Sequence, residues 1–291
     1  MKKKKKFSIG NLIFGSLLFA FALFCMYPMI YVVFASFSDP IKLAQHTGIL
    51  LWPLDFTLKG YEIIMGYESI WTGYKNTLIV IVAGVSVNMV MTVIAAYVLS
   101  RKELCVHKFL NIMVIFTMYF GGGMIPTYMI VKYLGLLDTL WALIIPGAIS
   151  TWNMIIVRSA IEGIPSTLTD AAKIDGANDW KTLTQVIIPL IKPTLAVIAL
   201  YYMVGHWNSY FSAMIYLQDR SKYPLQLILR EILITGKNIA TTGGFDMTEL
   251  DRYKDLTKYC STVVAVLPVL VIYPFLQKYF VKGVFTGAVK E

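Results

Sequence analysis

The chain has 291 residues, of which 57% are hydrophobic and only 15% charged, and its mean hydropathy is +0.65. A soluble domain of this length would need more charge to cover its surface, so these values exclude a soluble protein and predict a membrane protein. The net charge of +9 is also found in nucleic-acid-binding proteins, and its distribution along the chain argues against that class.

Six apolar stretches are long enough to cross a bilayer as helices, for which about 20 residues are needed. In chain order they are residues 9–34, 77–99, 109–131, 140–161, 195–217 and 259–280. They are too long for the strands of a membrane β-barrel, and their side chains do not alternate in polarity. The sequence therefore predicts an all-α, polytopic membrane protein with six transmembrane helices.

The charges fit one orientation of these six spans. With the N-terminus in the cytoplasm, segments 2–6, 101–108, 158–193 and 278–291 are inside and hold 15 Lys/Arg against 6 Asp/Glu, whereas the outer segments hold 11 of each. This asymmetry follows the positive-inside rule, so both termini are predicted to be cytoplasmic and MKKKKK is interpreted as a topology signal. The first apolar run continues far past the core of a signal peptide and predicts an uncleaved helix.

The segments outside the membrane differ in length. Two outer loops, residues 38–74 and 218–258, are long, and each is a contact for a partner, a lid or a solvated tether. We expect three parts: residues 1–72 with the first helix and outer loop, residues 73–280 as the transmembrane core with a cytoplasmic elbow at 165–189, and the cytoplasmic tail 281–291.

Several chemical motifs are absent from the sequence. No Asp or Glu lies in any of the six spans, although ion-coupled carriers usually need one. The chain has no phosphate-binding loop, catalytic constellation or metal-ligand spacing, and its three cysteines are scattered. FGGGMIP at 120–126 indicates a helix kink or a close helix contact. We therefore expect no enzyme, cofactor or metal in this chain, and energy supplied by another subunit.

A polar segment at 165–193 interrupts the apolar pattern between the fourth and fifth spans. Pro165 ends the fourth helix, and Ser166 or Thr167 is predicted to cap a short new helix. Thr167 and Asp170 have capping-box spacing.

Gly176 is predicted to end this short helix in the left-handed conformation, and Asn178 to cap a second helix. Pro189 and Pro193 then direct the chain back into the membrane. The composition favours docking of this elbow to a soluble partner over the alternative, a helix lying on lipid head groups.

The elbow resembles the EAA motif of binding-protein-dependent ABC importer permeases, which reads EAA, three residues, Gly, nine residues, then I-x-L-P. The corresponding positions are Asp170, Ala171, Ala172, Gly176, Val186, Ile188 and Pro189. The departures are Asp for Glu, Val for Ile and Ile for Leu, and they keep the spacing. Blocks at 95–101, 121–150, 204–211, 223–232 and 273–291 are similar to the carbohydrate branch of these permeases. Within that branch they resemble the second permease of maltose-type importers, in the subgroup that serves oligosaccharide lipoprotein receptors of Gram-positive bacteria.

This resemblance implies the ABC importer permease fold in a cell membrane and an elbow, residues 167–177, that seats in a cytosolic ATPase dimer. The residues expected to couple to the ATPase are Asp170, Ala171, Ala172, Asp175, Gly176 and Ala177. ATP and Mg²⁺ would be bound by that partner. A homologous second permease would complete a heterodimer. An extracytoplasmic sugar-binding protein or lipoprotein would deliver the sugar to the outer mouth, with the 218–258 loop as the candidate contact for this receptor.

The fifth span carries the side chains that a sugar path would need, because aromatic faces contact sugar C–H groups and amides bind hydroxyls. Ser209 and Ala213 continue the face of Tyr202 and His206. The candidates for the substrate path are Tyr202, His206, Trp207, Asn208, Tyr210 and, in the fourth span, Asn153. The alternative is that these polar groups, and Asn88, bond to neighbouring helices.

Three other functions are weighed against this interpretation, and only the third, a scaffold, is not excluded by the sequence. An ion-coupled secondary carrier would need buried carboxylates and usually more helices. A membrane enzyme would need a catalytic constellation, whereas the three His are at different depths. A scaffold that recruits a cytosolic partner would keep the elbow without a polar fifth span.

Overall fold

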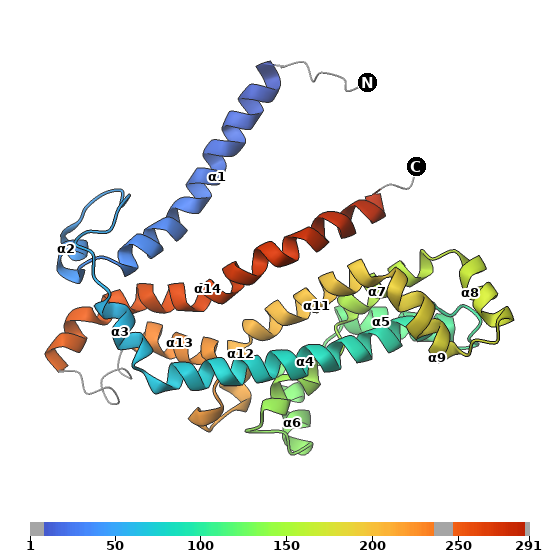
Figure 1. The fold of residues 1–291 in the computed structure, drawn as a ribbon. Helices are drawn as coiled ribbons and strands as arrows, with labels where there is room; N and C mark the ends of the chain where they lie inside the picture. The colour runs from blue at the N-terminus through green and yellow to red at the C-terminus, as the bar shows by residue number, and fades with distance from the viewer. Residues whose placement is uncertain (1–8, 236–246, 289–291) are drawn as a thin grey trace. The chain divides into compact units, whose positions relative to one another are not determined.

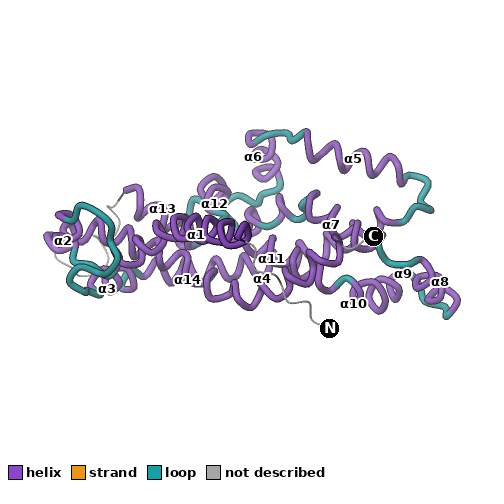
Figure 2. The backbone as a smooth tube through the Cα atoms, turned by 90° about the horizontal axis from the view of Figure 1, so that it is seen from above, coloured by secondary structure: helices purple, strands orange, loops and turns teal. Residues whose placement is uncertain are grey.

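The structure is a computed structural model, and it describes residues 9–235 and 247–288. The elements are α1 (Ile9–Ser36), α2 (Pro40–Gln45), α3 (Lys59–Met65), α4 (Glu68–Ser100), α5 (His107–Tyr119), α6 (Met124–Tyr133), η1 (Leu140–Leu143), η2 (Ile145–Gly147), α7 (Thr151–Glu162), α8 (Ser166–Ile174), α9 (Asp179–Lys181), η3 (Thr182–Ile187), α10 (Ile188–Leu190), α11 (Lys192–Trp207), α12 (Tyr210–Tyr216), η4 (Arg220–Lys222), α13 (Leu225–Thr235) and α14 (Met247–Ala288). These residues form helices and loops without a strand (Figures 1 and 2). The predicted all-α class is confirmed.

Two helices of the described residues are long and apolar enough to cross a membrane, Leu12–Ser36 and Glu68–Ser100. Three bent helix pairs also qualify if each crosses as one span, which gives up to five. The sixth predicted span, 259–280, lies within α14, whose side chains are described only in part. The count of six and the cytoplasmic side of both termini stay predictions.

The third and fourth predicted spans are bent rather than straight, and a further bend lies just before the fifth. The axes of α5 and α6 differ by 113°, those of η1–η2 and α7 by 50°, and those of α9–α10 and α11 by 85°. The first bend follows from consecutive glycines at 121–123, since Gly123 has a φ of +85° that other residues rarely adopt. The kink expected at FGGGMIP is confirmed, and a single straight helix over 109–131 is corrected.

The chain forms two compact units, the first made of residues 1–68 and 231–267 and the second of residues 69–230 and 268–291. In the first unit, the apolar side chains of α1 are largely exposed, and Phe24 keeps 77% of its surface accessible. Such a surface needs lipid or another protein to cover it. Helix α3 lies so close to α14 that a Cβ on Gly60 would be 2.7 Å from Cys260 Sγ, and this approach requires the glycine.

Both predicted outer loops contain helices in this structure. Residues 38–74 include α2, α3 and the first turn of α4, and α2 is capped by Asp39, which accepts bonds from two backbone N–H groups. Residues 218–258 include η4, α13 and the first turns of α14, while 236–246 lie outside the described residues.

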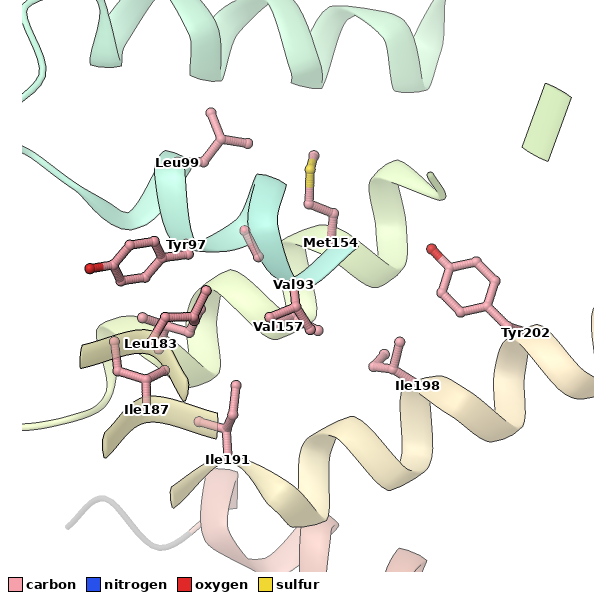
Figure 3. Packing of buried hydrophobic residues seen from close by; sticks show 12 residues of the cluster. Val93, Tyr97, Leu99, Met154, Val157, Leu183, Ile187, Ile191, Ile198 and Tyr202 are labelled. Carbon is pink, nitrogen blue, oxygen red and sulfur yellow. The ribbon is translucent and has the colours of Figure 1, made fainter. Parts of the chain in front are cut away.

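The second unit is built around α4. Its first apolar core joins α4, α7, η3 and α11 through interdigitated Leu, Ile, Val and Met side chains (Figure 3). The buried members are Val93, Ala96, Tyr97, Leu99, Met154, Val157, Ile161, Leu183, Ile187, Ile191, Ile198 and Tyr202. This core holds the second half of the elbow, which includes η3, against the C-terminal half of α4.

The other end of α4 packs against the segment from η4 to α13. A Cβ on Gly73 would lie 2.7 Å from Ile228 Cδ1 and 3.0 Å from Leu225 Cα, so only glycine allows this approach. Asn76 donates to the carbonyl oxygens of Ser221 and Tyr223, at 2.8 and 3.1 Å. The elbow and α13 therefore lie at opposite ends of α4 (Figures 1 and 2).

Asp138 joins the loop after α6 to the loop after α12. Its Oδ1 accepts the backbone N–H groups of Gln218 and Asp219 at 3.0 and 2.9 Å, and its Oδ2 accepts Lys222 Nζ at 2.7 Å. Its own N–H donates to Tyr216 O at 2.8 Å. The backbone φ of +57° is one that Asp and Asn tolerate better than most residues.

We expect Asp138→Asn to lower the thermal unfolding midpoint of the detergent-solubilised protein by a few degrees at neutral pH. The Lys222 ammonium and then the two backbone N–H groups lower the pKa of Asp138 from 3.8 to about 2. A lowered carboxyl pKa stabilises the fold above pH about 4, and this stabilisation is lost as the pH falls through about 2. Asn keeps the backbone conformation, so the difference in midpoint between the two proteins should shrink between pH 4 and 2. An equal difference at every pH would contradict the role of the charge.

Candidate coupling site and substrate path

Helix α8 is the first half of the elbow, and its start differs from the prediction. Pro165 is the residue before the first helical turn, and no side chain caps it. Ser166 and Thr167 already lie inside that turn, so the expected cap by Ser166 or Thr167 and the Thr167–Asp170 capping box are wrong. The reason is positional, because a capping side chain must come from the non-helical residue before the first turn.

The end of α8 is as predicted. Gly176 has a φ of +78°, and its N–H bonds to Lys173 O at 3.0 Å, while Ala177 N–H bonds to Ala172 O at 2.9 Å. This pair of bonds is a Schellman motif, which needs a left-handed residue at the position of Gly176. The predicted cap at Asn178 is also confirmed, since its Oδ1 accepts Lys181 N–H at 2.8 Å.

The elbow presents an uncovered surface at the end of the second unit. Helix α8 has no buried residue, and the apolar side chains Ile174 and Trp180 are 86% and 63% exposed. The predicted coupling residues Asp170, Ala171, Asp175 and Gly176 are exposed, while Ala172 and Ala177 are half-buried. Exposed Ile and Trp beside acidic groups suit a protein groove better than water.

An ion pair that the sequence analysis missed fixes the elbow to α4. Arg101 donates to Asp179 Oδ1 at 2.5 Å, and the Tyr97 hydroxyl donates to the same oxygen at 2.9 Å. Arg101 also bonds to the Tyr97 hydroxyl and lies over its ring. Farther along the elbow, Lys173 Nζ lies 3.4 Å from Glu103 Oε1. These contacts connect the elbow to the end of α4.

In the fifth span, the structure places the predicted face on the inside of the second unit. Tyr202 and His206 are 7% and 9% exposed, and Ala213 is fully buried. The Tyr202 hydroxyl lies 2.6 Å from Thr92 Oγ1 and accepts Ser150 N–H at 2.9 Å. Trp207 and Asn153 are also buried. The side chains of this face contact neighbouring helices of the chain, and their role in a substrate path stays a prediction.

Asn88 organises the polar contacts of His206. Its Oδ1 lies 2.7 Å from His206 Nε2, and its Nδ2 donates to the carbonyl oxygens of Gly147 and Ala148 at 2.7 and 3.0 Å. A Cβ on Gly84 would lie 2.5 Å from His206 Nε2, so the glycine makes room for the imidazole. Buried polar groups satisfied in this way hold membrane helices together.

The opposite face of this span is open. The helix breaks at Asn208 and Ser209 between α11 and α12, and Asn208, Tyr210 and Phe211 are exposed. Asn208 Nδ2 donates to Val204 O at 2.9 Å. A broken helix with an exposed amide is unfavourable against lipid, so this face is expected to meet protein or water. Of the predicted substrate-path residues, Asn208 and Tyr210 lie on it.

A family comparison agrees with this arrangement. Residues 104–286 match the model of the family described as "Binding-protein-dependent transport system inner membrane component". The chain belongs to this family. The matched range contains the elbow and the broken fifth span, and the family is a component of transport systems rather than an enzyme.

Relatives of this permease cover nearly its whole length. It is 41% identical over 283 residues to the polygalacturonan/rhamnogalacturonan transport system permease protein YtcP of Bacillus subtilis, covering 96% of this chain and 97% of the relative. Protein LplC of the same organism is 38% identical over 263 residues, and the alignment covers 90% of this chain and 88% of LplC. A chain from the crystal structure of a bacterial ABC transporter that imports the acidic polysaccharide alginate has 32% identity and a TM-score of 0.85, covering 95% of this permease and 100% of that chain.

Proposed function

We propose that this permease is the transmembrane subunit of an ATP-driven, binding-protein-dependent carbohydrate importer. The observation that carries the proposal is the exposed elbow, shaped by Gly176 and held to α4 by the Arg101–Asp179 pair. A docking surface outside the membrane with a rigid connection to the spans is what coupling to an ATPase requires.

The partners follow from this role. A cytosolic ATPase dimer supplies ATP hydrolysis with Mg²⁺, and residues 167–177 seat in its groove. A homologous second permease covers the open face of α11 and α12. An extracytoplasmic sugar-binding protein or lipoprotein delivers the substrate, and residues 218–258 are the candidate contact for it.

The substrate class we propose is an oligosaccharide of uronate sugars, which carry a carboxylate on the ring. Two relatives above 30% identity have a substrate in their names, polygalacturonan/rhamnogalacturonan in one and alginate in the other. Galacturonan is a polymer of uronate units, and alginate is described as acidic. The proposal extends this shared chemistry to the present permease.

The test begins with gentle extraction of the tagged permease from its native membrane and identification of the proteins that copurify. We expect a second permease, an ATPase and an extracytoplasmic binding protein. The complex is then placed in liposomes, and uptake of a labelled trigalacturonate is measured with the binding protein present. Uptake should require ATP, and the methyl ester of the same trisaccharide should be transported much less.

The controls separate the alternatives. Uptake that follows a proton or sodium gradient without ATP would support an ion-coupled carrier and contradict the proposal. Isolation of the permease with no ATPase and no second permease would favour a scaffold. Equal uptake of the acid and its ester would retain the importer and remove the uronate class.

A further inference from the structure

Arg230 differs from other arginines of the second unit in its partners. Arg101 is paired with Asp179 and Arg158 with Glu162 at 2.8 Å. Within the described part of the chain, no carboxylate pairs with Arg230, and its recorded contact is with an aromatic ring. A guanidinium is always charged and is only half-buried here, so it retains the capacity to bind an anion.

The ring below Arg230 belongs to the open face of the broken fifth span. The guanidinium carbon lies 5.7 Å from the centroid of the Tyr210 ring, within the range of a cation–π contact. Tyr210 is 41% exposed, and the neighbouring Phe211 ring is 51% exposed. Tyr210 is two residues from the exposed amide of Asn208, across the break between α11 and α12.

Lys222 in η4 is a cation with a structural role, and its partners differ from those of Arg230. Its ammonium lies 2.7 Å from Asp138 and 3.5 Å from Asp219, so it is already neutralised. Its bond to Asp138 ties together two loops. Arg230 has no such carboxylate among the described residues, and its fork of N–H groups is suited to a planar carboxylate.

We propose that Arg230, together with Tyr210 and Asn208, binds the carboxylate-bearing ring of an acidic oligosaccharide at the break in the fifth span. Arg230 binds the carboxylate with paired hydrogen bonds, the Tyr210 ring contacts the C–H face of the sugar, and Asn208 Oδ1 accepts a sugar hydroxyl. This site rests on the proposed function. It adds the guanidinium of Arg230 as the group that makes the permease prefer the uronate oligosaccharide to its methyl ester.

The test compares uptake of trigalacturonate and its methyl ester by complexes that contain Arg230→Gln, Arg230→Lys or the unchanged permease. Loss of a hydrogen-bonded charge should reduce the preference for the acid by about ten- to a hundred-fold in Arg230→Gln. Arg230→Lys keeps the charge without the fork and should retain an intermediate preference. Uptake of the ester, which carries no carboxylate, should change less than uptake of the acid in both variants.

Different failures point to different conclusions. If Arg230→Gln lowers uptake of acid and ester alike, Arg230 only holds α13 on α12, and the proposed site is overturned. If the unchanged permease prefers the acid and Arg230→Gln keeps that preference, the site is wrong and the importer function stands. If the unchanged complex shows no ATP-dependent uptake of either sugar, the proposed function and the site both fail. Arg230→Lys decides the question if Arg230→Gln does not assemble.

Discussion

Gly176→Val reduces ATP-dependent uptake at least about ten-fold, while the permease stays in the membrane and still binds the second permease. Gly176 has a φ of +78°, where a β-branched side chain is strained by roughly 1–2 kcal/mol or more, and 1.4 kcal/mol corresponds to ten-fold. A Cβ on Gly176 meets no atom within 4 Å, so the effect comes from the backbone and not from a steric clash with a neighbour. The measurement is uptake per assembled complex in liposomes.

Gly176→Asn is the matched control, because Asn enters the left-handed region more readily than other residues. It should keep most of the uptake, although its side chain is larger than that of Gly. Equal loss in both variants would show that the elbow surface, and not its turn, is what the substitution damages. Full uptake by Gly176→Val would remove the coupling role from this turn.

Breaking the Arg101–Asp179 pair uncouples ATP hydrolysis from transport. We expect Arg101→Gln to lower uptake several-fold while the complex still hydrolyses ATP, since the elbow remains docked but loses its ion pair at the end of α4. The stability lost is small, because exposed ion pairs contribute roughly 0–1 kcal/mol. Arg101 is the less exposed partner, with 20% of its side-chain surface accessible against 79% for Asp179. Because uptake should fall while hydrolysis continues, the measurement is the ratio of sugar taken up to ATP hydrolysed.

Two variants sharpen the test of this pair. Lys102→Gln removes the same charge from the next residue, which is exposed, and should leave the ratio unchanged. Exchange of the two residues, Arg101→Asp with Asp179→Arg, should restore part of the coupling if opposite charge is what matters. An unchanged ratio in Arg101→Gln would mean that the packing of η3 against α4 is sufficient.

Local chemistry explains which parts of the elbow were predictable. A left-handed turn needs glycine and a helix start needs an Asn, Asp or Ser cap, so Gly176 and Asn178 could be assigned from their own sequence. The predicted cap at Ser166 or Thr167 was wrong because Pro165 occupies the cap position, one residue before Ser166 and two before Thr167. The Arg101–Asp179 pair spans 78 residues, and no local pattern indicates it.

The buried face of the fifth span could not be predicted from the periodicity of its apolar residues. In a membrane helix the side that meets lipid and the side that meets protein are both apolar, so the hydrophobic period does not identify the buried side. The sequence predicted the face through Tyr202 and His206 as a substrate path. In the structure this face is buried against α4, α7 and their connections. Arg230 was passed over because its contact with Tyr210 comes from another helix.

The break at Asn208 also bears on the life of the protein in the cell. An exposed amide and interrupted backbone hydrogen bonds within a predicted span are tolerated only when protein or water covers them. A copy synthesised in excess of its partner would hold this face against lipid, and cells degrade incompletely assembled proteins of marginal stability. With the second permease of the proposed importer as the cover of this face, we expect the abundance of this permease to follow the supply of that chain.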